Sequence, residues 1–138
     1  MLTLAIIKPD AVAAGNAGNV LAHLERQGFK VRAARMVRLT TPQAEAFYAV
    51  HRERPFFRSL VTFMTSGACI PLALERDGAV AHLREVIGAT DPAEAKPGTV
   101  RKLWAQSKER NAIHASDSPE NAAREVAFFF SEGELAGL

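Results

Sequence analysis

The sequence lacks the residues and segments that mark several large classes of protein. A single cysteine, Cys69, cannot form an internal disulfide and excludes a Cys-x-x-Cys metal site. No apolar run approaches the roughly 20 residues of a membrane-spanning helix. The apolar start, residues 2–7, is too short for a secretory signal and has no basic lead-in. These absences favour a cytoplasmic protein without a membrane partner.

Neither sign of charge dominates the chain. Lys and Arg total 17 and Asp and Glu total 15, which leaves a net charge of +2. Without a clustered basic surface, we expect no nucleic-acid partner. Hydrophobic residues make up 48% and charged residues 23%, which is an ordinary balance for a folded protein. A length of 138 residues suits one domain spanning residues 1–138.

Strand-like and helix-like segments alternate and predict an α+β fold. Strands are expected at 2–7, 29–39, 68–74 and 111–115, and helices at 19–27, 41–50, 57–65, 79–87 and 119–130, with a helical turn at 100–105. Thr41 and Ser118 are the expected N-caps of two helices, each followed by proline. The order predicts a ferredoxin-like (split βαβ) four-stranded antiparallel sheet with an added helical hairpin and a C-terminal helix. A doubly wound sheet is the alternative, and it needs more strand–helix repeats than this chain offers.

The common phosphate-binding and hydrolase motifs are missing. There is no G-x-x-x-x-G-K-[ST] loop, no G-x-G-x-x-G fingerprint and no G-x-S-x-G elbow. Any phosphate-handling site must therefore be built in another way. Among the histidines, His23 and His82 lie in predicted amphipathic helices, and His51 lies in a charged run at a helix end. These three positions suggest structural or solvated side chains.

His114 differs because the last predicted helix begins directly after it, at Ser116-Asp117-Ser118. The free N–H groups and positive end of that helix would stabilise an anion beside the imidazole. On spacing alone, a core histidine next to a capped helix is the more common interpretation. Lys8 leaves a similar choice, since it ends a buried strand and can either reach water or point into a site at the sheet edge.

Several blocks of sequence, taken together and in order, resemble the nucleoside diphosphate kinase family from end to end. The blocks are Ile7-Lys8-Pro9-Asp10, Phe47-Tyr48, Arg54-Pro55-Phe56-Phe57, Phe63-Met64-Thr65-Ser66-Gly67, Gly88-Ala89-Thr90-Asp91-Pro92, Lys96-Pro97-Gly98-Thr99-Val100-Arg101 and Asn111-Ala112-Ile113-His114-Ala115-Ser116-Asp117-Ser118. The last block is similar to the family's motif around its phosphorylated histidine. The family's ferredoxin-like fold with an added helical hairpin agrees with the order of elements above.

The resemblance implies an enzyme that moves the γ-phosphate of a nucleoside triphosphate, typically ATP, to a nucleoside diphosphate. His114 would be the nucleophile of a ping-pong cycle, phosphorylated on a ring nitrogen. The positions that match the family's nucleotide-binding residues are Lys8, Phe56, Arg84, Thr90, Arg101 and Asn111. The positions that match residues supporting the histidine are Tyr48, Ser116 and Glu125.

Each matched residue has an implied role. Lys8, Arg84, Thr90 and Arg101 would hold the phosphates, Phe56 would stack on the base, and Asn111 would contact the sugar hydroxyls. Tyr48 would help to place His114, and Glu125, with Ser116 as its neighbour, would bond the other ring nitrogen of His114 and fix its tautomer.

The resemblance also implies a cofactor and a partner. Mg²⁺ would arrive on the nucleotide phosphates, because the sequence shows no carboxylate cage for it. The partner would be a second copy of the chain, since the family forms dimers that can assemble into tetramers or hexamers. One departure bears on the site: Ala115 stands where the family most often has glycine. Alanine would cost energy there if the backbone needs a positive φ.

Two other classes of protein share this scaffold. An RNA-binding ferredoxin-like domain needs aromatic residues on its central strands, and residues 2–7 and 68–74 contain none. A non-catalytic nucleotide-binding protein is the second class, because a fold does not fix a function. The matched His114, Lys8 and Arg101 favour the active enzyme, and ADP release on adding ATP with a second diphosphate would discriminate.

Overall fold

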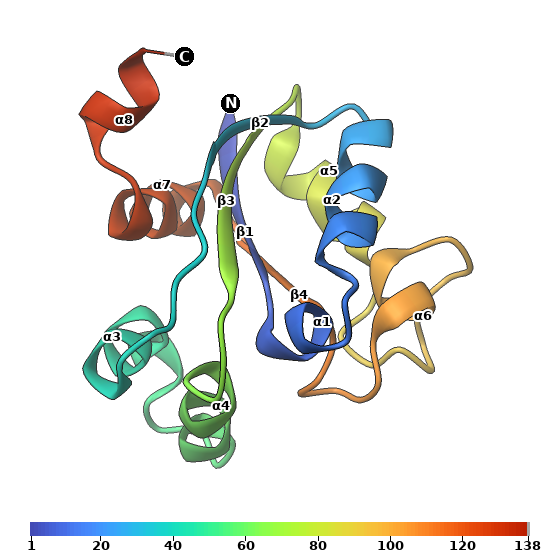
Figure 1. The fold of residues 1–138 in the computed structure, drawn as a ribbon, viewed down its shortest axis with the longest axis vertical. Coiled ribbons are helices and arrows are strands. Elements are labelled where there is room, and N and C mark those ends of the chain that lie inside the picture. Colours follow the sequence, from blue (N-terminus) through green and yellow to red (C-terminus); the bar gives the residue numbers. More distant parts are fainter. Residues whose placement is uncertain (138) are drawn as a thin grey trace.

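The computed structural model describes residues 1–137, and its elements follow the expected order (Figure 1). They are β1 (Leu2–Ile7), α1 (Pro9–Ala13), α2 (Ala17–Arg26), β2 (Lys30–Ala34), α3 (Thr41–Phe47), a 3₁₀ turn (Ala49–His51), α4 (Phe57–Met64), β3 (Ile70–Glu75), α5 (Ala79–Ile87), α6 (Val100–Trp104), β4 (Ile113–Ala115), α7 (Pro119–Phe129) and α8 (Glu132–Ala136). None of the helices in this part of the chain is long and apolar enough to cross a membrane.

The four strands form one antiparallel sheet in the order β2-β3-β1-β4. Strand β1 runs against β3 in register from Leu2↔Glu75 to Ile7↔Ile70, and on its other side it pairs with β4, where Ile6 lies opposite His114. The predicted ferredoxin-like sheet with an inserted helical hairpin, α3–α4, is confirmed. The doubly wound alternative is wrong, because every neighbouring pair of strands is antiparallel.

Helices cover both faces of the sheet, with α3, α4, α7 and α8 on one side and α1, α2, α5 and α6 on the other (Figure 1). Successive side chains of β1 point to opposite faces of the sheet, so this strand contributes to the apolar clusters on both sides. Leu4 and Ile6 join the apolar cluster beneath α3, α4 and α7, whereas Ala5 and Ile7 join the cluster beneath α2 and α5. A strand buried on both faces reads as a continuous apolar run.

Two predicted elements are too long, and one predicted N-cap is displaced by one residue. The strand expected at 29–39 ends at Ala34, because β2 is an edge strand that bulges between Val31 and Ala33. The helix expected at 41–50 ends at Phe47, and a 3₁₀ turn continues the chain to His51. Its N-cap is Thr40, not Thr41, and the Thr40 and Gln43 side chains form a capping box.

Two short helices were not expected. Helix α1 begins with Pro9 directly after β1, so the Lys8-Pro9-Asp10 break starts a helix as well as ending a strand. Helix α8 is capped by Ser131, whose hydroxyl accepts from the Glu134 N–H in a second capping box. Pro9 at the start of α1 and the Ser131 cap of α8 are both visible in the sequence, but five-residue helices carry no apolar periodicity that would reveal them.

Candidate active site

A cavity of about 540 Å³ lies at the edge of the sheet where β1 and β4 meet the α3–α4 hairpin and α7. Nine of the ten residues expected in the site line it: Lys8, Tyr48, Phe56, Arg84, Thr90, Arg101, Asn111, His114 and Glu125. The tenth, Ser116, lies behind Glu125 and bonds to it. The fold thus gathers side chains that are up to 117 residues apart, from Lys8 to Glu125, around one space.

His114 reaches this cavity because of its place in the sheet. It lies opposite Ile6 in the β1–β4 ladder, so both side chains project from the same face, toward α3 and α7. Its Nε2 lies 2.7 Å from Oε1 of Glu125, which also accepts a 2.7 Å hydrogen bond from the Ser116 hydroxyl. The imidazole is therefore held in a fixed orientation by α7.

The charge state of this pair follows from its surroundings. Burial lowers the pKa of His114, and the nearby Lys8 and Arg101 lower it further against the opposing effect of Glu125. Burial works to raise the pKa of Glu125, but its hydrogen bonds with His114 and Ser116 hold that pKa below its usual value. An ionised carboxylate only accepts hydrogen bonds. Near pH 7 the proton therefore sits on Nε2 of a neutral imidazole, and Nδ1 carries the free lone pair.

Three cations converge on the same cavity. Lys8 and Arg101 are buried, and the Arg84 side chain is exposed on α5. Lys8 Nζ donates to Asn111 Oδ1 at 2.9 Å, and Arg84 Nη1 donates to the Ala115 carbonyl at 3.3 Å. Within residues 1–137, none of the three forms an ion pair with a carboxylate.

The two buried cations, Lys8 and Arg101, favour the binding of an anion. Burial lowers the pKa of Lys8 to about 8 and that of Arg101 to about 10, with the neighbouring cation as the next cause in each case. A buried positive charge is costly unless it is paired. An anionic ligand with several oxygens would supply the missing counter-charge.

The loop after α5 holds Arg101 in place. The guanidinium donates to the carbonyls of Gly88, at 3.0 Å, and Ile113, at 2.8 Å. Gly88 has φ of 88°, and a Cβ added there would lie 2.6 Å from Oγ1 of Thr99. Only glycine fits at this position, which ends α5 and turns the chain toward Thr90.

Aromatic rings wall the cavity on the side of the hairpin. The rings of Phe47 and Tyr48 lie edge-on to His114, with centroids 5.3 and 5.9 Å away. The buried Tyr48 hydroxyl has no hydrogen-bond partner among the described residues. Phe56 stands 43% exposed at the mouth, so one face of its ring is open to a flat ligand.

The backbone around His114 is strained at Ala112 and not at Ala115. The only residue other than glycine with a positive φ in residues 1–137 is Ala112, at 73°. Ala115 therefore carries no left-handed strain. The strand expected at 111–115 instead begins at Ile113, because a residue with φ of 73° cannot continue a strand.

Several cavity residues were missed or misjudged from the sequence. His51, which was expected to be solvated, lines the cavity, and its ring lies 5.4 Å from that of Phe56. Further lining residues that had no expected role are Lys108, Glu109, Asp117, Asn121 and Arg124. Lys108 and Glu109 lie just before Asn111, whereas Arg124 adjoins Glu125, and Asn121 and Asp117 lie four and eight residues before it. Only the fold shows that they face inward.

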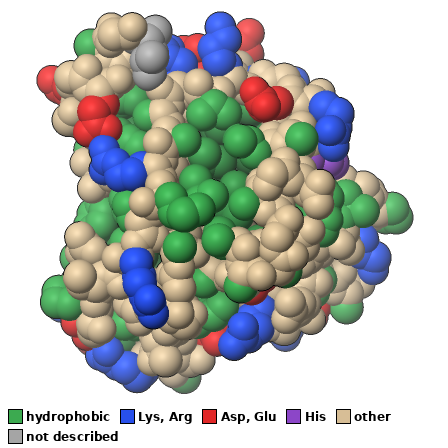
Figure 2. Space-filling model, in the orientation of Figure 1, with side chains coloured by type: hydrophobic (Ala, Val, Ile, Leu, Met, Phe, Trp, Pro, Cys, Tyr) green, Lys and Arg blue, Asp and Glu red, His purple; other side chains and the backbone are tan. Residues whose placement is uncertain are grey.

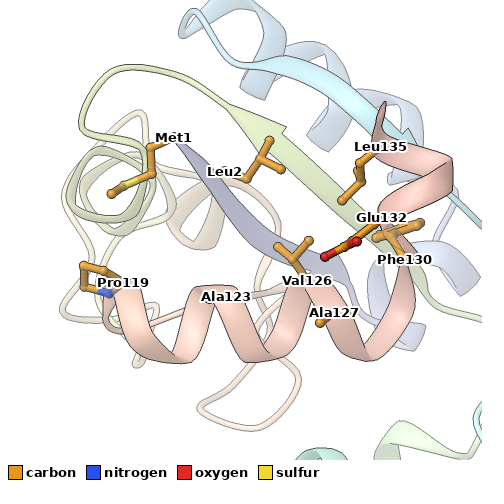
Figure 3. Close-up of a pocket in the computed structure, with 9 residues that line it drawn as sticks. All are labelled: Met1, Leu2, Pro119, Ala123, Val126, Ala127, Phe130, Glu132 and Leu135. Atoms are coloured by element: carbon orange, nitrogen blue, oxygen red, sulfur yellow. The ribbon is translucent and has the colours of Figure 1, made fainter. Parts of the chain in front are cut away.

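A second cavity, of about 430 Å³, lies on the other side of α7 (Figure 3). Apolar side chains of α7, α8 and the start of β1 line it, among them Leu2, Val126, Phe130 and Leu135. Its one charged lining residue is Glu132. None of the side chains that line it is a nucleophile or a cation, so the lining points to no chemistry.

Comparisons with known proteins agree with this geometry. The family model described as nucleoside diphosphate kinase matches residues 2–135. A nucleoside diphosphate kinase of Chlorobium chlorochromatii is 60% identical over 133 residues, which cover 96% of this chain and 95% of that protein. One from Desulfatibacillum aliphaticivorans is 53% identical, with 98% of each chain covered.

Solved structures show the same likeness in three dimensions. The crystal structure of the Aquifex aeolicus nucleoside diphosphate kinase superposes with a TM-score of 0.95 at 46% identity, covering 97% of each chain. A halophilic nucleoside diphosphate kinase from Halobacterium salinarum, solved in complex with CDP, gives a TM-score of 0.93 at 36% identity, covering 98% of this chain and 90% of that one.

Proposed function

The chain belongs to the nucleoside diphosphate kinase family, and we propose that it carries the phosphoryl group between nucleotides on Nδ1 of His114. In the first half-reaction, the Nδ1 lone pair attacks the γ-phosphorus of a nucleoside triphosphate. The bond between that phosphorus and the bridging oxygen breaks, and the nucleoside diphosphate leaves. In the second half-reaction, a β-phosphate oxygen of another diphosphate attacks the phosphohistidine and regenerates the imidazole.

The Glu125–His114 contact supports this role for Nδ1. Since Glu125 holds Nε2–H at 2.7 Å, the neutral ring presents its lone pair at Nδ1 without losing a proton first. When phosphorus binds Nδ1, the ring gains positive charge, which the Glu125 carboxylate stabilises. Ser116 keeps that carboxylate in place.

The cations would stabilise the transferring group. Positive charge from Lys8, Arg84 and Arg101, with the Thr90 hydroxyl, would spread over the phosphoryl oxygens, and this electrostatic stabilisation is most of what phosphoryl transfer requires. The absence of carboxylate partners for these cations within the described residues supports this assignment.

The nucleoside would bind toward the mouth of the cavity. The exposed ring of Phe56 offers a stacking surface that accepts any base, and Asn111 lies at hydrogen-bonding distance from Lys8, where a sugar hydroxyl would join both. A site that binds the base by stacking alone suits a kinase that accepts both purine and pyrimidine nucleotides.

Mg²⁺ is the proposed cofactor, carried on the nucleotide. Within residues 1–137, no group of three His, Cys, Asp or Glu side chains could hold a metal ion, so the protein provides no cage of its own. When bound to the phosphates, Mg²⁺ neutralises their developing charge.

The proposed macromolecular partner is a second copy of the chain. Strand β2 is an edge of the sheet and pairs only with β3 among the described strands. Figure 2 shows hydrophobic side chains gathered in the middle of the face that carries β2 and β3 in Figure 1. An apolar face beside an open strand edge favours pairing with another chain.

The observation that carries the proposal is a fixed neutral histidine at the wall of a cavity lined by unpaired cations. The test is single-turnover labelling with Mg²⁺ and γ-labelled ATP. The expected protein-bound label is acid-labile and base-stable, and a nucleoside diphosphate discharges it. His114→Ala should abolish labelling while the protein still folds and binds nucleotide.

His82→Ala is the matched control, because His82 lies on α5 outside the cavity and contacts the Phe29 ring. This variant should label as the unaltered protein does. Label that persists in His114→Ala would overturn the assignment of the nucleophile. Bound nucleotide without any label would reassign the site as a binding module.

A further inference from the structure

Asp10 lies outside the cavity but is bonded to the backbone that leads into His114. Its Oδ2 accepts a buried 3.1 Å hydrogen bond from the N–H of Ala112, 102 residues away in the sequence. The side chain is 5% exposed, and burial raises the pKa of its carboxyl, against the lowering effects of the Ala112 N–H and Lys8. A buried carboxylate is costly, so a specific partner is expected for it.

The partner residue is the one strained position near the site. Ala112 has φ of 73°, and the N–H of Ile113 donates to the carbonyl of Asn111 at 2.9 Å. A hydrogen bond from residue i+2 to residue i, around a centre with positive φ, defines the rarer and more strained kind of γ-turn. Such conformations persist only where the surrounding structure holds them.

The segment after β1 holds both polar groups of this residue. The carbonyl of Ala112 accepts from the N–H of Lys8 at 2.9 Å, and its N–H donates to Asp10. The first bond merely extends the β1–β4 ladder by one position, so any residue at position 8 other than proline could make it. The second bond depends on the side chain of Asp10.

The turn sets the geometry of the site on both of its sides. Asn111, immediately before Ala112, bonds to Lys8 Nζ, and His114 lies two residues after Ala112. We infer that Asp10 is a positioning residue for phosphoryl transfer, which clamps the γ-turn at Ala112 so that the imidazole of His114 stays aligned between Glu125 and the phosphoryl group. This inference rests on the proposed role of His114.

Asp10 does not line the cavity, so a substrate does not touch it. Its loss should therefore change the rate of transfer and leave nucleotide binding intact. Loss of its negative charge has two opposed effects on phosphate binding, because it removes an anion close to Lys8 but also lowers the pKa of Lys8, which Asp10 raises. A displacement of about 1 Å in a reacting group costs roughly 100-fold in rate.

The experiment measures single-turnover phosphorylation of the full chain with Mg²⁺ and labelled ATP, and it separates rate constant from amplitude. In Asp10→Ala, we expect the rate constant at saturating ATP to fall roughly 100-fold, with the half-saturating ATP concentration little changed. A purely structural role would instead reduce the amplitude, through loss of folded protein, and leave the rate constant of the folded fraction unchanged.

Two further variants separate the hydrogen bond from the charge. Asp10→Asn keeps an acceptor oxygen and should stay within about threefold of the unaltered rate constant. Adding Ala112→Gly to Asp10→Ala should recover about tenfold, because glycine adopts φ near 73° without steric cost. Asp77→Ala, in the exposed turn before α5, is the matched control and should change nothing.

The outcomes are distinct. An unchanged rate constant in Asp10→Ala, a raised half-saturating concentration as its only effect, or an Asp10→Asn variant as slow as Asp10→Ala would each overturn the inference. If the unaltered protein forms no phosphohistidine, the proposed function fails first. If it does and Asp10→Ala matches it, only the role of Asp10 fails.

Discussion

Helix α7 separates two cavities of similar size and opposite character. Toward the sheet edge, Asn121, Arg124 and Glu125 line the 540 Å³ cavity that holds His114. Toward α8, residues including Ala123, Val126 and Ala127 line the 430 Å³ apolar cavity (Figure 3). The helix period of 3.6 residues accounts for this division, because positions 121, 124 and 125 share one face and 123, 126, 127 and 130 share another.

The comparison shows that a cavity is not in itself a site. Both spaces could admit a small molecule, but only one contains the fixed imidazole of His114 and cations that form no ion pair with a carboxylate among the described residues. Glu125 and Val126 are neighbours in sequence, yet the first holds the imidazole of His114 while the second belongs to the apolar cluster that also contains Phe129 and Leu4. Adjacent substitutions on α7 should therefore have separable effects.

The largest effect is expected from Glu125→Gln. The amide keeps the size of the side chain but removes the negative charge that fixes the proton on Nε2 and stabilises the phosphohistidine. Because a glutamine can also present its N–H to the ring and so favour the wrong tautomer, kcat/KM should fall roughly 100-fold or more. The measurement is nucleoside diphosphate phosphorylation by ATP under steady-state conditions.

Glu120→Gln is the matched control for that change. It makes the same substitution on the same helix, but Glu120 is exposed in the first turn of α7 and lines neither cavity. Its kcat/KM should stay within twofold of the unaltered protein. Equal losses in both variants would mean that charge on α7, and not the contact with His114, supports catalysis.

A smaller effect, about tenfold per pH unit, is expected in nucleotide binding. Lys8 has a pKa of about 8 in the free protein, and phosphates favour its protonated form. Binding above pH 8 must therefore take up a proton, and the dissociation constant for ADP should rise as the pH increases toward 9.5.

Calorimetric titration between pH 7.5 and 9.5 measures this dependence. Lys8→Gln should bind ADP more weakly and with a much smaller pH dependence, since only Arg101, with a pKa of about 10, begins to titrate near the top of the range. A dissociation constant that does not change with pH in the unaltered protein would show that Lys8 does not charge on binding.

The sequence predicts long helices well, because their apolar positions recur over several turns. It predicts short helices poorly, because only the residues at their ends mark them. Helices α5 and α7 were predicted to within one residue because apolar positions recur over nine residues or more. The five-residue helices α1 and α8 were missed, and β4 was predicted too long. A positive φ at an alanine has no signature in the residue type, so Ala112 could not be foreseen.

The site shows a similar division. The resemblance to the family picks out ten residues, and the structure places all ten in or beside one cavity. Considered as single residues, however, His114 was more easily interpreted as a core histidine and Lys8 as a side chain that reaches water. The sequence does not show that two side chains 106 positions apart face the same cavity. Asp10 belongs to one of the family motifs, but the sequence suggested no role for it, since its partner is a backbone N–H far along the chain.

Val126→Ala should have the smallest effect on catalysis and a clear effect on stability. The change removes two buried carbons beside a cavity that already exists, at a cost of about 1.5–2 kcal/mol in the free energy of unfolding. Denaturant titration measures this loss, and kcat/KM should stay within twofold because the backbone of α7 keeps Glu125 in place. A stable but slow variant would instead mean that the apolar side of α7 sets the position of Glu125, and the two cavities would then have to be treated as one unit.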